Sequence, residues 1–422
     1  MRDMNSNSES RLRGFMPVLA LLALAILINY VDRGNLSIAA PALKDELHLS
    51  GTRLGLLFSA FFFAYTAFIF VNSWLVDRFA VNWVLAGGFA LWSLATTGTG
   101  LVTGFATLFL MRLLLGMGES VAFPTSSKIL AQNLPECDRG FANGLICCGM
   151  KLGPAAGIFG AGMLMAKFGW RPVFIGIGLI SLLWLPAWFR WMPRRPAKPA
   201  GSAISGAAGY ADVLRQPSFW GASAGHFCFN YLSYFLVSWL PFYLVHERQL
   251  AMTAMVKTAG AYYVLDALSA FGTGWLTDFL IRRGASVTVV RKGAMFIGAS
   301  LAAAGLAGCA MAGPQTYLWW LAVLGVGSGM GGAGIFTFAQ TLAGPRTAGR
   351  WAALQNGFGN LSGWISPALT GYLLDRTGHF TAPLAIAAIV CVIGGLAWVF
   401  GVGRLEAATW APVRAATLAP AE

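Results

Sequence analysis

The 422-residue sequence predicts an all-α membrane protein with twelve transmembrane helices in two pseudo-symmetric six-helix bundles. Three observations support this prediction: an apolar composition, twelve long apolar segments, and a loose repeat with a period of about half the chain. Hydrophobic residues make up 57% of the chain and charged residues only 11%, whereas a soluble domain is about 25% charged. A mean hydropathy of +0.65 therefore argues against a large soluble enzyme.

The apolar segments are long enough to cross about 30 Å of hydrocarbon as helices that rise roughly 1.5 Å per residue. We expect them at 15–40, 52–77, 82–103, 105–131, 140–166, 171–192, 217–245, 256–281, 293–313, 316–341, 350–374 and 380–402. The first of them follows a polar stretch and lacks a small-residue cleavage site, so we interpret it as a retained helix rather than a signal peptide.

Basic residues are unevenly divided between the two sets of loops. The two terminal tails and the even-numbered connections carry eighteen of them, and the odd-numbered connections carry seven. The positive-inside rule then puts both termini in the cytoplasm of a bacterial inner membrane. Because the bases are spread over loops, the net charge of +13 does not indicate nucleic-acid binding.

The longest connection divides the chain into two halves that resemble each other. Residues 192–217, "MPRRPAKPAGSAISGAAGYADVLRQP", are rich in Pro, Gly, Ala and Ser, as linkers are. "WLVDR", "LGPAAG" and "PECDRGFA" each have a loose counterpart about 210 residues later, in "WLTDF", "ISPALTG" and "PRTAGRWA". We expect a tail (1–14), a bundle (15–192), a linker (193–216), a second bundle (217–402) and a second tail (403–422). Two such repeats around a central cavity are typical of transporters.

Three stretches carry a family resemblance: "NYVDRGNLSIAAPAL", "RLLLGMGESVAFP" and "QNGFGNLSGWISPALTGYLLDRTG". They resemble the major facilitator superfamily, and within it the anion:cation symporter branch of bacteria, which includes galactonate, glucarate and hexuronate permeases. The resemblance extends from about Asn29 to Trp398. It implies that superfamily's fold and secondary transport of a small organic acid.

The loop after the second span departs from the superfamily pattern G-x-x-x-D-R-x-G-R-R/K. In "NSWLVDRFAVNW", Asp77 and Arg78 remain, but Asn72 replaces the first glycine and no basic pair follows. The copy in the second half keeps Gly274, Asp278, Arg282 and Arg283. The resemblance implies gating or structural roles for Asp77, Arg78, Asp278 and Arg282. It also implies that the two halves contribute unequally to the contacts that hold the cytoplasmic gate closed.

Ionisable residues at membrane depth are costly unless they face a cavity or a partner, so they are candidates for function. A guanidinium grips a carboxylate with two parallel hydrogen bonds, which makes Arg33 the candidate for the substrate carboxylate. Asp32 is then a candidate proton carrier. The alternative is a local ion pair that fixes the first helix against a neighbour.

Arg112 and Glu119 lie seven residues apart, two turns along one helical face. Glu119 is a second proton-coupling candidate, and the resemblance supports this role for it and for Asp32. The alternative is a permanent pair with Arg112 or Lys151, which makes Arg112 a structural or gating charge. Lys151 either binds the far end of the anion or balances Glu119. Asp266 either faces an aqueous path or pairs with a base.

Several uncharged residues are candidate substrate contacts because helical spacing places them on shared faces. Asn29 shares a face with Arg33, and the seventh and eleventh spans carry amides and phenols three or four residues apart. The candidates are Asn29, Tyr65, Asn230, Tyr231, Tyr234, Asn356 and Asn360. The alternative for the aromatic members is ordinary helix packing.

These residues predict proton-coupled uptake of a small organic anion, such as a sugar acid, by alternating access. The alternatives are uptake of an aromatic carboxylate, a drug or metabolite exporter on the same fold, and a non-transporting sensor. We expect no enzyme activity, cofactor, metal site, nucleic acid or obligate protein partner: the cysteines lack metal-ligand spacing, and "GVGSGMGGAG" lies in an apolar helix rather than after a strand. The expected partners are the anion, protons and lipid.

Overall fold

The computed structural model describes residues 2–134, 142, 145–146, 149–150, 152–192, 209–313, 315–332, 334–406, 408 and 410. Every regular element of this described part is helical, because a backbone in lipid must satisfy its own hydrogen bonds. The first half contains α1 (Arg2–Glu46), α2 (Gly51–Arg78), α3 (Val81–Leu101), α4 (Phe105–Glu119), α5 (Ala122–Asn133), the π-helical turn η1 (Gly157–Ala161), α7 (Gly162–Phe168), α8 (Trp170–Ser181) and α9 (Trp184–Trp191). The predicted linker at 193–216 falls mostly outside the described residues.

The second half repeats the pattern of long helices. It contains α10 (Tyr210–Leu214), α11 (Pro217–His246), α12 (Met252–Arg282), α13 (Val287–Met311), α14 (Tyr317–Gly332), α15 (Ile335–Asn360), α16 (Ser362–Thr377), α17 (Thr381–Leu396) and the π-helical turn η2 (Ala397–Gly401).

Within the described residues, nine helices are long and apolar enough to cross a membrane. They match nine of the twelve predicted spans, and the remaining three correspond to shorter or broken helices. The fifth span is only partly described, and its described end is the apolar helix Leu152–Phe168. The tenth and eleventh are represented by α14, α15 and α16.

The tenth predicted span divides between α14 and the start of α15, and the eleventh divides between the rest of α15 and α16. Gly344 has φ 68° and ψ 169°, a conformation that glycine adopts at little cost, so α15 consists of two helical pieces. A second break at Leu361 separates α15 from α16. The predicted connection between 341 and 350 therefore contains the kink at Gly344, where the two helical pieces of α15 meet.

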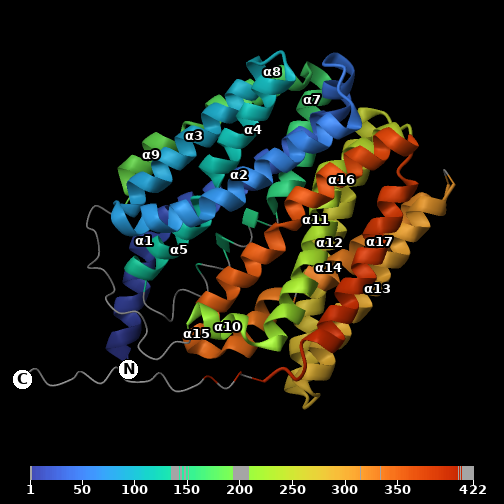
Figure 1. Cartoon of the computed structure of the whole chain (residues 1–422). Coiled ribbons are helices and arrows are strands. Elements are labelled where there is room, and N and C mark those ends of the chain that lie inside the picture. The colour runs from blue at the N-terminus through green and yellow to red at the C-terminus, as the bar shows by residue number, and fades with distance from the viewer. Residues whose placement is uncertain are drawn as a thin grey trace, which may run out of the picture.

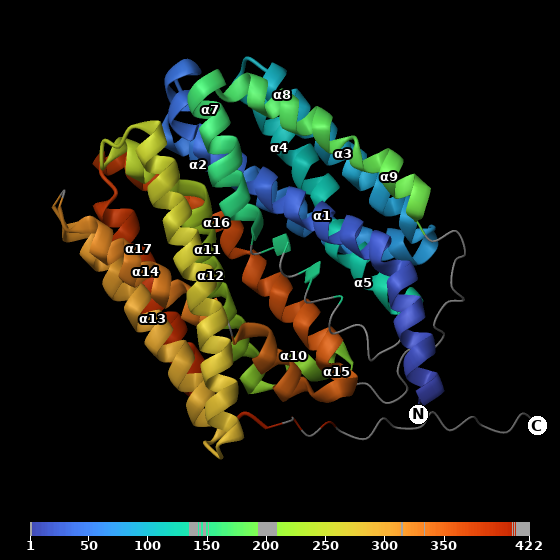
Figure 2. The ribbon, with the colours of Figure 1, turned by 180° about the vertical axis from the view of Figure 1, so that it is seen from behind.

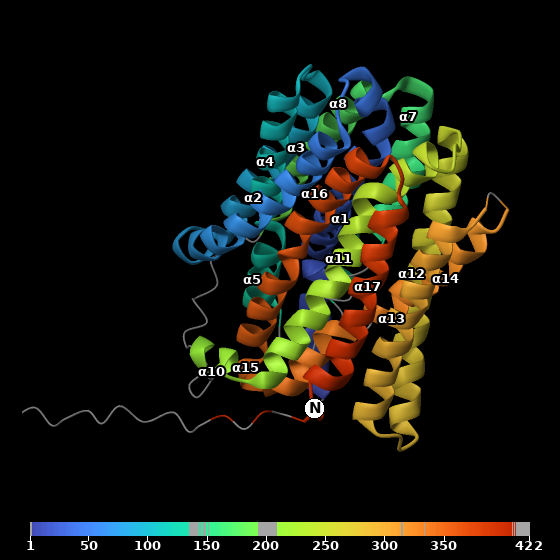
Figure 3. The same cartoon turned by 45° about the vertical axis from the view of Figure 1, so that its right-hand side comes forward.

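The two halves converge at one end of the molecule. We call the end where α1 finishes and α2 begins the upper end, and the end where α1 begins the lower end. Figures 1 and 2 show the ribbons of the two halves side by side at the upper end and diverging toward the lower end, where α5, α10 and α15 lie. Figure 3 shows α2 and α16 crossing each other at the junction, and these two helices pack together.

The buried apolar clusters follow the same division. One cluster joins both halves near the upper end and contains Leu43 and Leu57 from the first half with Trp239 and Phe380 from the second. A second cluster belongs largely to the first half, and a third, around Trp351, belongs to the second half. The upper end is therefore a shared core, whereas toward the lower end each half has its own.

Small residues allow the backbones of the two halves to approach closely. A side chain on Gly55 of α2 would collide with the carbonyl of Pro367 in α16, and one on Gly260 of α12 would collide with the ring of Phe159 in η1. Close packing of this kind drives helix association in lipid, where burial of apolar surface contributes little. The two contacts are related by the pseudo-symmetry of the halves.

Candidate functional site

The two charged residues in the middle of α1, Asp32 and Arg33, lie inside the first half. Asn29 and Asp32 are almost fully buried, and the side chain of Arg33 is 9% exposed. Arg33 Nε donates a hydrogen bond to Oε2 of Glu119 at 3.0 Å, which joins α1 to the end of α4. Arg33 thus pairs with Glu119 rather than with the adjacent Asp32, as in the alternative of an ion pair that fixes the first helix against a neighbour. Among the described residues Glu119 forms no salt bridge with Arg112, and the alternative partner Lys151 lies outside them.

Aromatic rings enclose the faces of the Arg33 guanidinium. Its carbon lies 4.5 Å from the ring centre of Tyr30, 4.7 Å from that of Tyr65 and 5.3 Å from that of Phe61. These cation–π contacts hold the plane of the guanidinium. Its Nη2 is buried and forms no hydrogen bond to any described residue, so this nitrogen of Arg33 has no partner in the described part of the chain.

The other buried charges of the first half surround this pair. Asp32 lies within electrostatic range of Glu119 and Arg112, and its Oδ1 accepts a hydrogen bond from Asn35 Nδ2 at 3.2 Å. The Arg112 guanidinium lies 5.0 Å from the ring centre of Phe61. Two guanidinium groups and two carboxyl groups therefore share one enclosed region, with a formal charge of zero when both carboxyls are ionised.

Some buried polar atoms in this region have no hydrogen-bond partner among the described residues. They include both side-chain polar atoms of Asn29, Arg112 Nε and Glu119 Oε1. A buried polar atom without a partner costs about 1–3 kcal/mol, so native proteins concentrate such atoms where a ligand, a proton or water is handled. Their clustering around Arg33 makes this region the candidate functional site.

The second half contributes a polar pair opposite Arg33. The Tyr234 hydroxyl on α11 donates a short hydrogen bond to Asn360 Oδ1 at the end of α15, and Asn360 Nδ2 donates to the carbonyl of Asn356 at 2.8 Å. The Tyr234 ring centre lies 4.1 Å from that of Phe62 on α2, and Tyr234 is within electrostatic range of Arg33. The predicted contacts Arg33, Tyr65, Tyr234 and Asn360 therefore come together across the junction of the halves.

Other predicted contacts lie elsewhere. Tyr231 is buried in the shared core, and its carbonyl accepts a hydrogen bond from Ser366 at 3.0 Å. Asn230 borders Gly359 on α15. Lys151 lies outside the described residues. Asp266 belongs to α12, within electrostatic range of Tyr262 and Tyr263.

Comparison with known proteins settles the family. The model of the Major Facilitator Superfamily matches residues 22–367. The chain belongs to the Major Facilitator Superfamily. It is a multi-pass membrane transporter and not an enzyme, and the predictions of fold class and family are confirmed.

Curated relatives of this superfamily member resemble it over almost its whole length. The hexuronate transporter of Bacillus subtilis (strain 168) is 29% identical over 90% of this chain and 93% of its own. A probable sulfoacetate transporter, SauU, of Cupriavidus necator is 29% identical over 93% and 95%, and the probable galactarate/D-glucarate transporter GarP of Escherichia coli (strain K12) is 28% identical over 92% and 95%.

A solved structure confirms the fold of this superfamily member independently of sequence. A bacterial homologue of the human lysosomal transporter Spinster, in an inward-facing and unoccupied conformation, aligns with a TM-score of 0.73 at 18% identity. The alignment covers 91% of this chain and 94% of the other.

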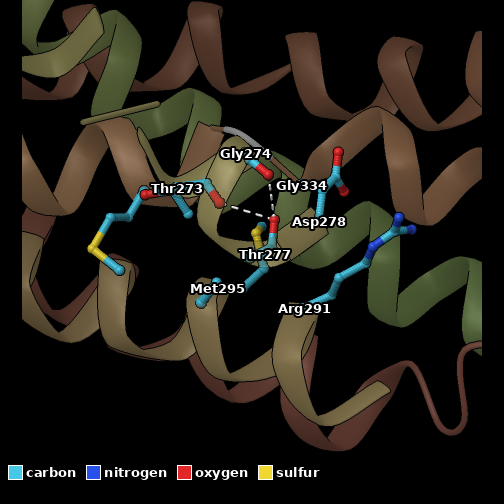
Figure 4. A pocket seen from close by; sticks show the side chains of 9 residues that line it. Thr273, Gly274, Thr277, Asp278, Arg291, Met295 and Gly334 are labelled. Carbon is cyan, nitrogen blue, oxygen red and sulfur yellow. Dashed lines mark hydrogen bonds between the residues drawn. The ribbon is translucent and has the colours of Figure 1, made fainter. Parts of the chain in front are cut away.

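The predicted gating charges lie at the lower end of this transporter. Arg282 Nε donates to the carbonyl of Asp278 at 3.3 Å. Asp278 and Arg291 border one small pocket of about 160 Å³ between α12 and α13, and Thr277 in its wall donates to the carbonyls of Thr273 and Gly274 (Figure 4). Arg78 ends α2 and is exposed, and the side chain of Asp77 lies outside the described residues.

Two residues that contact the candidate site escaped the sequence analysis. Tyr30 covers the Arg33 guanidinium, and its position three residues before Arg33, one helical turn away, was the signal that could have found it. Asn72 appeared only as a departure from the superfamily loop pattern. Its Nδ2 donates to Oγ of Ser120 at 2.6 Å, which ties α2 to the residue after Glu119.

Proposed function

We propose that this transporter carries a small organic anion, together with protons, into the cell by alternating access. The observation that carries the proposal is the Arg33–Glu119 ion pair. It lies opposite Tyr234 and Asn360 and leaves Arg33 Nη2 without a hydrogen-bond partner among the described residues. The anion would bind where the two halves meet, so that rocking of the halves exposes it to one side at a time.

The charges of the region give a reason for proton coupling. Glu119 holds Arg33 while it is ionised, and a proton on Glu119 removes that competition and frees the guanidinium for a substrate carboxylate. Because the four buried charges that the structure describes here sum to zero, an added anion leaves a net charge that one proton cancels. A membrane potential opposes uptake by about 2.3 kcal/mol per charge per 100 mV, so at least one proton per carboxylate is required.

The substrate class follows from the relatives and from the site. The relatives are named as transporters of hexuronate, galactarate/D-glucarate and sulfoacetate, all small anions that a guanidinium can grip. The Tyr234–Asn360 pair offers hydroxyl and amide groups to a polyhydroxylated tail. We propose a sugar acid as the substrate.

An aromatic carboxylate is the second candidate. Aromatic rings surround the same region, from Tyr30, Phe62, Tyr65 and Tyr234. Such rings can stack on an aromatic substrate.

The basic loops support an orientation with both termini and the lower end in the cytoplasm of the bacterial inner membrane. With this orientation, the upper end faces away from the cytoplasm.

A binding screen followed by a transport assay tests the proposal. Purified protein is first screened by thermal shift against hexuronates, aldarates, sulfoacetate and benzoates. The stabilising anion is then used in proteoliposomes with an imposed pH gradient, acidic outside. We expect accumulation that a protonophore abolishes in the parent, and loss of binding and uptake in Arg33→Ala, with exposed Arg376→Ala as the control. Binding at parental affinity in Arg33→Ala would refute the site, and accumulation only under the reverse gradient would favour an exporter.

A further inference from the structure

The first turn of α2 is capped by a carboxylate from the opposite half. Asp375 Oδ1 accepts a hydrogen bond from the Gly51 amide at 2.6 Å, and its Oδ2 accepts one from the Thr52 amide at 2.7 Å. The first amides of a helix have no partner within that helix. Ser50 satisfies the amide of Arg53 at 3.2 Å, so Asp375 completes a cap that α2 does not build from its own sequence.

Asp375 is poorly placed for its own helix. It lies in the last turn of α16, which ends at the left-handed Gly378, and a negative charge near the C-terminus of a helix is unfavourable. The partial positive charge at the N-terminus of α2 instead attracts the Asp375 carboxylate and offsets this unfavourable interaction. Burial tends to raise the pKa of Asp375, but hydrogen bonds from Thr52 and Gly51 outweigh it and hold that pKa below its ordinary value.

The capped turn lies where the two backbones approach most tightly. A Cβ on Gly51 would lie 2.8 Å from Asp375 Oδ1 and 2.9 Å from the carbonyl of Gly371. One turn further along α2, Gly55 faces Pro367 in the same way. Because no side chain fills this seam, a small separation of α2 from α16 breaks both hydrogen bonds of Asp375 together.

We propose that Asp375 is a latch between the halves: its carboxylate holds the N-terminus of α2, keeps the upper end closed, and is released when the halves separate there. The inference rests on alternating access as proposed above. In this role, the Asp375 carboxylate stabilises the state that is closed at the upper end relative to the state that is open there.

Spin labels on the two halves measure this equilibrium. Thr103→Cys and Gln315→Cys place labels on exposed positions in upper-end loops of opposite halves, in a chain whose native cysteines are serine and whose uptake is verified. Pulsed dipolar spectroscopy in liposomes then compares the parent with Asp375→Asn, Asp375→Ala and the adjacent exposed control Arg376→Gln. Gly55→Leu serves as a steric wedge between α2 and α16.

We expect Asp375→Ala to raise the ratio of long to short label distances by about threefold to tenfold, which corresponds to the net contribution of one typical hydrogen bond; solvent weakens the two bonds because Asp375 is exposed. Asp375→Asn, which is isosteric and can accept only through one oxygen, should give a smaller increase in the same direction, and it carries the test if the alanine variant does not fold. Arg376→Gln should match the parent.

Two outcomes would overturn the latch, and they differ in what they imply. If Gly55→Leu lengthens the distances and neither Asp375 variant does, the latch is wrong while alternating access stands. If Gly55→Leu also leaves the distances unchanged, the halves do not separate at this end, and the latch fails together with the proposed transport cycle.

Discussion

Arg33 and Glu119, 86 residues apart in the sequence, form an ion pair at 3.0 Å between α1 and α4. The Glu119 side chain is fully buried and that of Arg33 nearly so. Breaking a buried pair leaves an uncompensated charge that is strongly destabilising. In the proposed cycle, exchange of the Glu119 carboxylate for a substrate carboxylate, with a proton added to Glu119, would keep Arg33 paired throughout.

The first prediction concerns Glu119→Gln. The amide mimics the protonated carboxyl, so Arg33 is permanently available to the anion but no proton can be released. We expect counterflow exchange of the anion to persist, while accumulation driven by a pH gradient is lost. Both are measured in proteoliposomes with labelled anion. Asp32→Asn is the matched comparison, and gradient-driven accumulation that survives in Glu119→Gln would move proton coupling to another group.

The second prediction concerns the polar pair of the second half. Tyr234→Phe removes the hydroxyl that donates to Asn360 Oδ1 but keeps the ring packed on Phe62. One neutral hydrogen bond contributes about 1 kcal/mol, so we expect roughly a fivefold loss of anion affinity. Isothermal titration measures it, with the exposed Tyr372→Phe as the control. Unchanged affinity in Tyr234→Phe would remove this pair from the binding site.

The third prediction concerns the Asn72–Ser120 hydrogen bond. Both side chains are buried, and the bond fixes the segment that follows Glu119. We expect Asn72→Ala to destabilise the protein by about 1 kcal/mol and to lower its melting temperature in detergent. A double-mutant cycle with Ser120→Ala should be non-additive, because the two side chains act as one unit. Strict additivity would show that the bond contributes nothing to stability.

The sequence predicted the fold from its long apolar segments. It also predicted most of the buried charged residues around Arg33, because a charge inside an apolar span is a strong signal. It did not find which charges pair. The seven-residue spacing suggested an interaction between Arg112 and Glu119, but α4 ends at Glu119, and the partner comes from α1. That pairing depends on how α1 packs on α4, which no local pattern encodes.

The uncharged lining was harder to predict for a related reason. Tyr231 and Tyr234 lie three residues apart on α11, yet one packs in the shared core and the other meets Asn360. A helix that is surrounded by protein and lipid has no polar face to orient it, so periodicity alone cannot separate a ligand contact from a packing residue. Tyr30 was missed because its position one helical turn before Arg33 was not used as a signal.

The last prediction separates the Asp375 latch from the proton-coupling residues by pH. The pKa of Asp375 is lowered in the closed state by its hydrogen bonds to α2, so its contribution is fully present above the ordinary aspartate pKa. That contribution is lost only as the pH falls through the lowered value. Between about pH 5 and pH 8, well above the ordinary aspartate value, we expect the difference in label distances between Asp375→Asn and the parent to stay constant. In contrast, any pH dependence of the parent itself in this range should disappear in Glu119→Gln or Asp32→Asn. A difference between Asp375→Asn and the parent that vanishes toward pH 5 would show that Asp375 takes up a proton within the working range and would make it a third coupling group rather than a fixed latch.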